Sequence, residues 1–313
     1  MKPAVLAYPH SDNLGDLIQS IAAKKLLSET PLAIDREALH TYAGEPVHLI
    51  LNGWFMENAQ HWPPSEKIKP LFISFHINPT VAEVFTQPKS ITYFKRHQPI
   101  GCRDLYTKAL LEKNGVEAYF SGCLTLTLNR QDFINKEQKH QGILLLSVLE
   151  RLKPKKPQWN TQSLVKDFLL QGIKYPFKSM HYAMAQSRLN RFLKQQKWPI
   201  IEHSQITDNA SLPETEKEAM AVQQLEAIAS ARCVITSRIH SALPAVAMGV
   251  PVLFLEDGLS HINQRSRLLG LNSLFTVMKT KALKHVQLEA LKNPKGVEHL
   301  VVELKRTISA AFA

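Results

Sequence analysis

Short apolar runs alternate with amphipathic stretches along most of the chain, and this alternation constrains the fold more than any other feature. The runs at 3–8, 47–53 and 71–77 have the length and apolar content of buried strands, and 17–27 has the apolar spacing of a helix. The same pattern restarts at 142–150. Strands that alternate with helices usually pair in parallel, with helices on both faces of the sheet. The sequence therefore predicts an α/β fold.

A polar stretch at 129–141 divides this pattern into two halves. We therefore expect two Rossmann-like domains that face each other across a cleft, an N-terminal domain of residues 1–135 and a C-terminal domain of residues 136–313. The C-terminal segment 297–312 has helical spacing, and we expect this helix to pack back on the first domain.

Further strands and helices are expected in both halves. The first half closes with a helix after residue 104 and a strand-like run at 117–128, and the second contains strand-like runs at 199–204 and 250–256 around a helix at 219–231. In sheets of this kind, ligands bind outside the carboxyl ends of the strands. Polar side chains at those ends are therefore the candidates for function.

The joint between a strand ending at Thr236 and the following helix carries the most specific signal. Arg238 and His240 lie there, and Ser237 at the same joint is a third ligand-binding candidate. A helix N-terminus favours anions, arginine adds a planar donor fork, and histidine carries a proton that moves near neutral pH. The alternative is a solvated arginine beside a histidine that caps the turn. We favour ligand binding because both residues lie where α/β folds place ligands.

A second arginine opens a predicted helix in the segment Gly101-Cys102-Arg103-Asp104. Arg103 could bind an anion, with Asp104 holding its guanidinium in place. An ordinary helix cap with a surface arginine explains this spacing equally well.

Two other predicted strands also end in polar residues. Asn13, Gly15 and Asp16 follow the first strand, where they could contact a substrate or cap the next helix, and capping is the more common role. Asn52 and Gly53 end the strand at 47–53 and could line the cleft. All five are substrate-binding candidates.

Glu256 ends the last strong strand and could bind sugar hydroxyls, although an ordinary turn explains it as well. A loop with His10, Asp12 and Asp16 could be imagined to bind a metal, but loops of this composition usually do not, and we expect no metal. Neither a Walker motif nor GxGxxG is present, so no nucleotide can be argued from motifs. We expect no cofactor.

The charge balance favours an anionic partner. Lys and Arg number 38 against 27 Asp and Glu, a net charge of +11. A phosphorylated metabolite, an acidic glycan, an anionic membrane or nucleic acid would each suit this surplus, and so would a merely solubilising surface. Three cysteines without metal-type spacing and a start without an apolar leader predict a cytoplasmic protein.

The stretch 174–197 carries six of these basic residues, among them Lys174, interleaved with large apolar side chains. This mixture could contact an anionic membrane, or a lipid-linked acceptor near one, at the inner membrane face. We favour a solvated helix face as the simpler explanation.

Four motifs give the chain a resemblance to the polysaccharide pyruvyl transferase family. They are N-L-G-D with an alanine six residues later at 13–22, G-C-R-D at 101–104, S-G-C-L-T-L-T at 121–127 and S-R-I-H-S-A-L-P-A-V-A-M-G-V-P-V at 237–252. The last is the most specific. The resemblance spans roughly residues 5 to 265.

The resemblance implies a fold similar to GT-B glycosyltransferases and transfer of the enolpyruvyl unit of phosphoenolpyruvate to a sugar as a ketal, with release of phosphate. Arg103 and Arg238 would then hold the donor anion, and His240 would protonate its methylene carbon. The acceptor would be a sugar of a cell-surface polysaccharide or of its lipid-linked or nucleotide precursor, and nucleic acid would not be a partner. Two alternatives stay open: a GT-B-like glycosyltransferase that uses a nucleotide sugar, and a non-catalytic glycan-binding protein.

Overall fold

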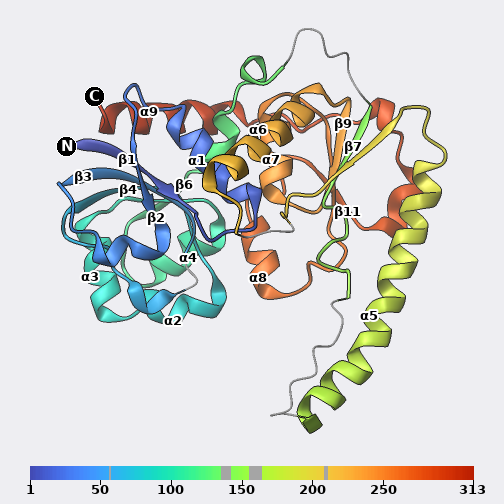
Figure 1. Ribbon diagram of the computed structural model, residues 1–313, viewed down its shortest axis with the longest axis horizontal. Coiled ribbons are helices and arrows are strands. Elements are labelled where there is room, and N and C mark those ends of the chain that lie inside the picture. The colour runs from blue at the N-terminus through green and yellow to red at the C-terminus, as the bar shows by residue number, and fades with distance from the viewer. Residues whose placement is uncertain (56–57, 135–141, 155–163, 208–210) are drawn as a thin grey trace.

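Two parallel β-sheets form the framework of the protein in the computed structural model (Figure 1). The structure describes residues 1–55, 58–134, 142–154, 164–207 and 211–313, with the backbone alone described for 164–174. The α/β class and the parallel pairing are thereby confirmed.

The first sheet has the strand order β2-β1-β3-β4-β5-β6, and every pair in it is parallel. Its strands are β1 (Lys2–Ala7), β2 (Leu32–Asp35), β3 (Val47–Phe55), β4 (Ile68–Ile77), β5 (Ile100–Cys102) and β6 (Ala118–Phe120). The helices of this half are α1 (Leu14–Lys24), α2 (Ala82–Phe85), α3 (Pro88–Arg96) and α4 (Leu105–Lys113). Because the chain reverses its direction of sheet growth at β1, the carboxyl ends of β1 and β3 flank a switch point, the usual ligand site of such sheets.

The second sheet has the order β11-β10-β9-β7-β8 and is also parallel throughout. Its strands are β7 (Ile143–Leu146), β8 (Ile200–His203), β9 (Cys233–Thr236), β10 (Val252–Leu255) and β11 (Thr276–Met278). The helices are α5 (Leu164–Leu193), α6 (Glu214–Ser230), α7 (Ile239–Ala247), α8 (Ile262–Arg265) and α9 (Glu298–Ala311).

One continuous apolar core joins the two halves. It contains Val5 and Ile50 of the first sheet together with Leu144 and Val234 of the second, and helices α1, α6 and α7 supply much of the rest. The ion pair between Lys24 and Glu218, 2.8 Å from Nζ to Oε1, adds a polar contact between α1 and α6. The predicted boundary at residue 135 falls in 135–141, outside the described residues.

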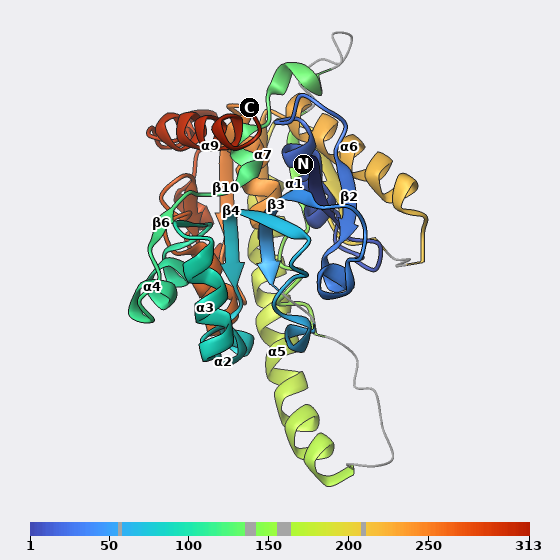
Figure 2. The ribbon, with the colours of Figure 1, turned by 90° about the vertical axis from the view of Figure 1, so that its left-hand side faces the viewer.

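Helix α9 crosses back to the first half and lies beside the N-terminus (Figures 1 and 2). Its apolar residues Leu300, Leu304 and Ile308 are buried, and the ring of Phe312 just beyond it stacks on His48 of β3 with centroids 4.3 Å apart. The C-terminal helix expected at 297–312 is thus present. Its contacts with the first half agree with the expected packing.

The expectation of a continuous strand at 117–128 is wrong. Only Ala118–Phe120 pairs with the sheet, and Leu124–Thr127 forms a short 3-10 helix. The apolar residues Leu124 and Leu126 point into the shared core instead of into a strand face. Burial at the junction of the two halves, and not strand pairing, explains why this run is so apolar.

Candidate active site

A β-bulge in β4 sets up the first part of the site. The pairing of β3 with β4 shifts between Leu51 and Gly53, so that β4 holds one extra residue there. Ser74 lies in this bulge with φ of 56°, a left-handed conformation that non-glycine residues rarely adopt. Its backbone N–H donates to Ser121 Oγ over 3.0 Å. A bulge re-aims the side chains that follow it, and the next polar one is His76.

His76 and Arg103 lie side by side at one edge of the first sheet. Phe75 of β4 pairs with Cys102 of β5, and the N–H of Arg103 donates to the Phe75 carbonyl over 2.8 Å. Arg103, just after β5, and His76, near the end of β4, therefore share the carboxyl edge of the sheet. The sequence indicated Arg103 but gave no reason to select His76.

The guanidinium of Arg103 is fully buried and lacks a hydrogen bond from all three of its nitrogens within the described residues. Its nearest carboxylate is Asp104, 3.7 Å from Nε to Oδ2. Burial of an incompletely paired charge is costly. A guanidinium in this state is a strong indication of an anionic ligand.

Asp104 interacts more closely with His76 than with Arg103. Its Oδ2 lies 2.6 Å from Nδ1 of His76, and its Oδ1 accepts from the N–H and the hydroxyl of Thr107, both at 3.0 Å. With Nδ1 as donor, Nε2 of His76 is an acceptor, and this buried atom has no partner among the described residues. Burial, together with the charge of Arg103, lowers the pKa of His76 to about 4 despite Asp104. His76 is therefore neutral at pH 7.

The second part of the site is the joint between β9 and α7. Ser237 fixes this joint by donating to the Leu255 carbonyl over 2.7 Å and accepting from the Leu149 N–H over 3.3 Å. Arg238 occupies the N-cap position of α7, and its Nη2 and Nε bind Oε2 of Glu150 at 2.5 and 3.1 Å. The predicted strand end at Thr236 and the helix that follows it are confirmed.

His240 lies in the first turn of α7 and is buried, with no partner for Nε2 among the described residues. Burial lowers the pKa of this imidazole well below its usual value, and the charges of Arg103, Arg267 and Arg238 lower it further. These charges come from both halves of the chain. The site is therefore shared between the two sheets.

Gly15 at the start of α1 allows His240 to approach. A Cβ atom on Gly15 would lie 2.9 Å from Cβ of His240 and 2.5 Å from Nε2 of Gln205, distances that only glycine permits. Asn13 caps α1 by accepting from the Gly15 N–H over 3.1 Å. Asn13 thus has the capping role that was the alternative to substrate binding, and its substrate contact stays a prediction.

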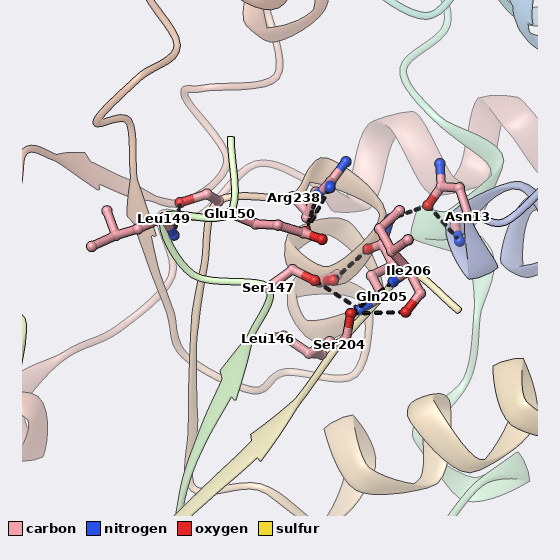
Figure 3. A network of polar contacts seen from close by, with 12 residues as sticks. Asn13, Leu146, Ser147, Leu149, Glu150, Ser204, Gln205, Ile206 and Arg238 are labelled. Atoms are coloured by element: carbon pink, nitrogen blue, oxygen red, sulfur yellow. Dashed lines mark hydrogen bonds and ion pairs between the residues drawn. The ribbon is translucent and has the colours of Figure 1, made fainter. Parts of the chain in front are cut away.

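Gln205, which follows β8, connects the start of α1 with the second part of the site (Figure 3). Its side chain donates to Asn13 over 2.7 Å and accepts from the hydroxyl of Ser241 over 2.5 Å. Its backbone N–H donates to Ser147 over 2.7 Å, and its carbonyl accepts from the N–H of Leu14 over 2.9 Å. This network fixes α1 of the first half against α7 of the second.

A small cavity of about 20 Å³ lies where these elements meet. Its lining includes four residues that the sequence predicted, Asn13, Ser237, Arg238 and His240. It also includes three that the sequence did not indicate, Arg151, Gln205 and Arg267. Burial and the charges of neighbouring arginines lower the pKa of Arg267 to about 9 and that of Arg151 to about 10. Such mutual repulsion between cations indicates that the site is built for a strongly anionic group.

The comparison with protein families decides the family. A model of the polysaccharide pyruvyl transferase family matches residues 13–257, most of the 313-residue chain. The chain belongs to this family.

The matched region of this pyruvyl transferase family member holds all of the arginines and histidines of the site except Arg267. Among solved structures, the chain is similar to a functionally uncharacterized protein from Klebsiella pneumoniae subsp. pneumoniae NTUH-K2044, with 12% identity over 85% of this chain and 86% of that one and a TM-score of 0.46. Comparison with curated proteins gives no significant match.

The other predicted residues of this family member lie close by at the switch point. Asp16 is buried and accepts from the Ser11 hydroxyl over 2.7 Å, and neither amide atom of Asn52 has a partner among the described residues. Gly53 has φ of 81°, and a Cβ there would lie 3.0 Å from the Tyr8 hydroxyl. A second cavity, of about 180 Å³, opens beside Tyr8 and Asp16.

Glu256 does not join this group. It lines a third cavity, of about 720 Å³, between α5 and the loop after β10. Leu259 lines both this cavity and the small one, so the two spaces are neighbours. Among the described residues, no group of three or more His, Cys, Asp or Glu could hold a metal ion, and no helix is both long and apolar enough to cross a membrane.

Proposed function

We propose that the protein transfers the enolpyruvyl unit of phosphoenolpyruvate to two hydroxyls of a sugar as a ketal and releases phosphate. The sugar would belong to a cell-surface polysaccharide or its precursor. The observation that carries this proposal is the buried guanidinium of Arg103, which has no hydrogen bond among the described residues and is electrostatically coupled to His240, as are Arg238 and Arg267. A donor with a phosphate and a carboxylate supplies the negative charge that this arrangement lacks.

The donor would bind in the small cavity. At about 20 Å³ the cavity has room for little more than a water molecule, so the donor must displace part of its wall. The ion pair between Arg238 and Glu150 is the contact that an incoming anion can replace, because Arg238 lines this cavity and Glu150 is partly exposed. Arg103, Arg267 and Arg151 would complete the binding of the anion.

Donor binding would also prepare His240 for catalysis. Burial and the neighbouring arginines lower its pKa, so the imidazole alone is neutral and a poor acid at pH 7. The negative charges of phosphoenolpyruvate would offset the arginines and raise this pKa, because an adjacent anion favours the charged imidazolium. The group would thus take up a proton when the donor arrives, which is when an acid is needed.

The proposed reaction adds two sugar hydroxyls in turn to the same carbon of the donor. His240 gives a proton to the methylene carbon of the donor, which becomes a methyl group and leaves an oxocarbenium-like centre at the neighbouring carbon. A sugar hydroxyl attacks that centre, and its proton passes to Nε2 of His76. The second hydroxyl then attacks, the bond to phosphate breaks, and phosphate leaves with the second proton. His76 returns its proton to solvent and His240 regains one from solvent.

The acceptor sugar would lie at the carboxyl ends of β1 and β3. The free amide atoms of Asn52 offer both a donor and acceptors to hydroxyls, and the absence of a side chain at Gly53 leaves room beside the Tyr8 hydroxyl. His76 of β4 pairs with Trp54 of β3, the residue directly after Gly53, so His76 lies on the strand next to this position. A hydroxyl bound there would be within reach of a base.

Calorimetric titration with phosphoenolpyruvate, UDP and UDP-galactose tests the donor. We expect phosphoenolpyruvate alone to bind, and binding to be lost in Arg103→Gln and Arg238→Gln but kept in Arg96→Gln, a control at an exposed arginine remote from the site. Binding of the nucleotides without phosphoenolpyruvate would assign the protein to nucleotide-sugar glycosyltransferases. Binding of neither would refute the donor site.

A further inference from the structure

Helix α5 projects from the body of the protein, and much of it is not covered by other elements (Figures 1 and 2). Its C-terminal part is anchored, because Ala185, Leu189 and Phe192 are buried in a core cluster with Leu283 and Leu288. Toward the N-terminus this packing ends. The side chains of this projecting helix are described from Tyr175 onward.

One face of this helix exposes large apolar side chains. Phe177 is 60% exposed, Met180 49% and Met184 45%, all among the most exposed large apolar residues of the described chain. Their spacing of three and four residues places them on one side of the helix. A solvated helix face would carry polar residues at these positions, so the expectation of a merely solvated face does not explain them.

The same face continues with cations. Arg188 and Arg191 follow Met184 by four and seven residues and are exposed. From Lys174 to Lys197 the sequence contains six basic residues and neither Asp nor Glu; the side chain of Lys174 lies outside the described residues. Apolar and basic side chains on one helix face are typical of helices that lie in a membrane interface.

The third cavity adjoins this face. Met184 and Arg188 belong both to the exposed face and to the cavity lining, where Arg265 and Lys279 add two further cations. The two carboxylates of the cavity are Glu256 and Asp257, and Asp257 is engaged by the N–H and hydroxyl of Thr280 at 2.7 and 2.9 Å. A phosphate group held beside the apolar side chains would therefore meet three cations.

We propose that the exposed face of α5 (Phe177, Met180, Met184, Arg188 and Arg191) docks on an anionic membrane surface, with lipid phosphates at the adjoining cavity. A second copy of the chain is a poorer occupant, because two copies of the basic stretch 174–197, which has neither Asp nor Glu, would repel each other. Anionic headgroups match the charge, and the acyl-chain boundary accepts the apolar side chains. The docking would place the small donor cavity next to the membrane, since Leu259 separates the two cavities.

Sedimentation of the full-length protein with lipid vesicles tests this surface. We expect binding to vesicles of phosphatidylcholine mixed with phosphatidylglycerol, weak binding to phosphatidylcholine alone, and loss of binding at high salt. The variant Phe177→Ser/Met180→Ser/Met184→Ser and the variant Arg188→Gln/Arg191→Gln should each bind about tenfold more weakly. Val302→Ser and Lys305→Gln, exposed positions on α9 far from α5, should bind as the wild type does.

All altered side chains are exposed, so circular dichroism and the melting temperature should not change. Three results would each overturn the proposal: a wild type that does not bind anionic vesicles, α5 variants that bind as well as the wild type, or a dimer in solution that the apolar α5 substitutions dissociate. Phosphoenolpyruvate titration of the same variants separates this surface from the proposed reaction. Unchanged donor binding with lost vesicle binding is the expected pattern.

Discussion

Replacement of Arg103 by methionine should stabilise the protein and abolish donor binding. The wild-type guanidinium is fully buried, has no hydrogen bond among the described residues and lies 3.7 Å from its nearest carboxylate. Methionine has a similar length and removes a buried charge that the unliganded protein compensates poorly. Replacement of a whole buried ion pair by apolar residues of similar volume is often neutral or stabilising by about 1–4 kcal/mol, whereas removal of one partner of a tight pair is costly. Arg103 is not in a tight pair, because Asp104 takes its hydrogen bonds from His76 and Thr107 and would keep them in the variant.

A gain of about 2 kcal/mol is therefore expected. With an unfolding entropy of about 2.1 cal/mol/K per residue, this raises the Tm of a chain of 313 residues by about 3 °C. Phosphoenolpyruvate at about 100 times its Kd should stabilise the wild type by about 2.7 kcal/mol, or about 4 °C, and should leave Arg103→Met unchanged. Differential scanning fluorimetry with and without phosphoenolpyruvate measures both effects.

Arg96→Met serves as the control, because Arg96 is exposed and its removal should change stability by less than about 0.5 kcal/mol. Arg103→Lys keeps the charge and should give no stabilisation. A lower Tm for Arg103→Met than for the wild type would show that the guanidinium holds the fold together, and the reasoning would fail. A ligand-induced shift that survives in Arg103→Met would equally refute the assigned role.

Four further predictions follow from the site and its surroundings. Because donor charge should raise the lowered pKa of His240, phosphoenolpyruvate binding near pH 7 should take up protons; calorimetry in buffers of different ionisation enthalpy measures this uptake, and an enthalpy independent of the buffer would contradict it. His76→Gln should lower pyruvyl transfer to a sugar acceptor by about 10²–10⁴-fold while donor affinity in calorimetry stays within about threefold, whereas loss of donor affinity would make His76 a binding residue. Gly15→Ala should destabilise the protein in urea unfolding by about 1–3 kcal/mol, since its Cβ would lie 2.5 Å from Nε2 of Gln205, and an unchanged midpoint would show that this contact relaxes freely. Burial lowers the pKa of His48 to about 4, so the unfolded chain binds its proton first and stability should fall as the pH drops from 6.5 towards 4; His48→Gln should lose less stability between about pH 7 and about pH 5, and an equal loss would exclude His48 as a cause.

Local patterns were sufficient for much of the fold. Apolar runs gave the strands at 47–53, 71–77 and 250–256, because a buried parallel strand needs a continuous apolar stretch whatever its neighbours are. The same reasoning failed at 117–128, where the apolar side chains are buried between the two halves and not within a sheet. Apolar content reports burial, and it does not say against what.

The residues of the site also divide into those that the sequence could predict and those that it could not. Arg103, Arg238 and His240 could be selected from sequence because each lies directly after a strand, where an α/β fold brings side chains to a common edge. Arg267 lies twelve residues beyond the last strand that precedes it, so nothing local distinguishes it. Gln205 follows β8 as closely as Arg238 follows β9, but it carries no charge that would single it out. Asp104 illustrates the limit well, since its spacing suggested a partner for Arg103, whereas the folded chain gives it to His76.

The sequence by itself therefore determined the α/β class, most of the strands and helices, and which strand ends carry the arginines and the histidine. These properties depend on residues within a few positions of each other. The tertiary structure alone decided that His76 lies beside Arg103, that four arginines repel one another with three of them lining one cavity, and that α5 exposes an apolar and basic face. Strand register, burial and electrostatic coupling join residues far apart in the chain, and they exist only once the two sheets have packed together.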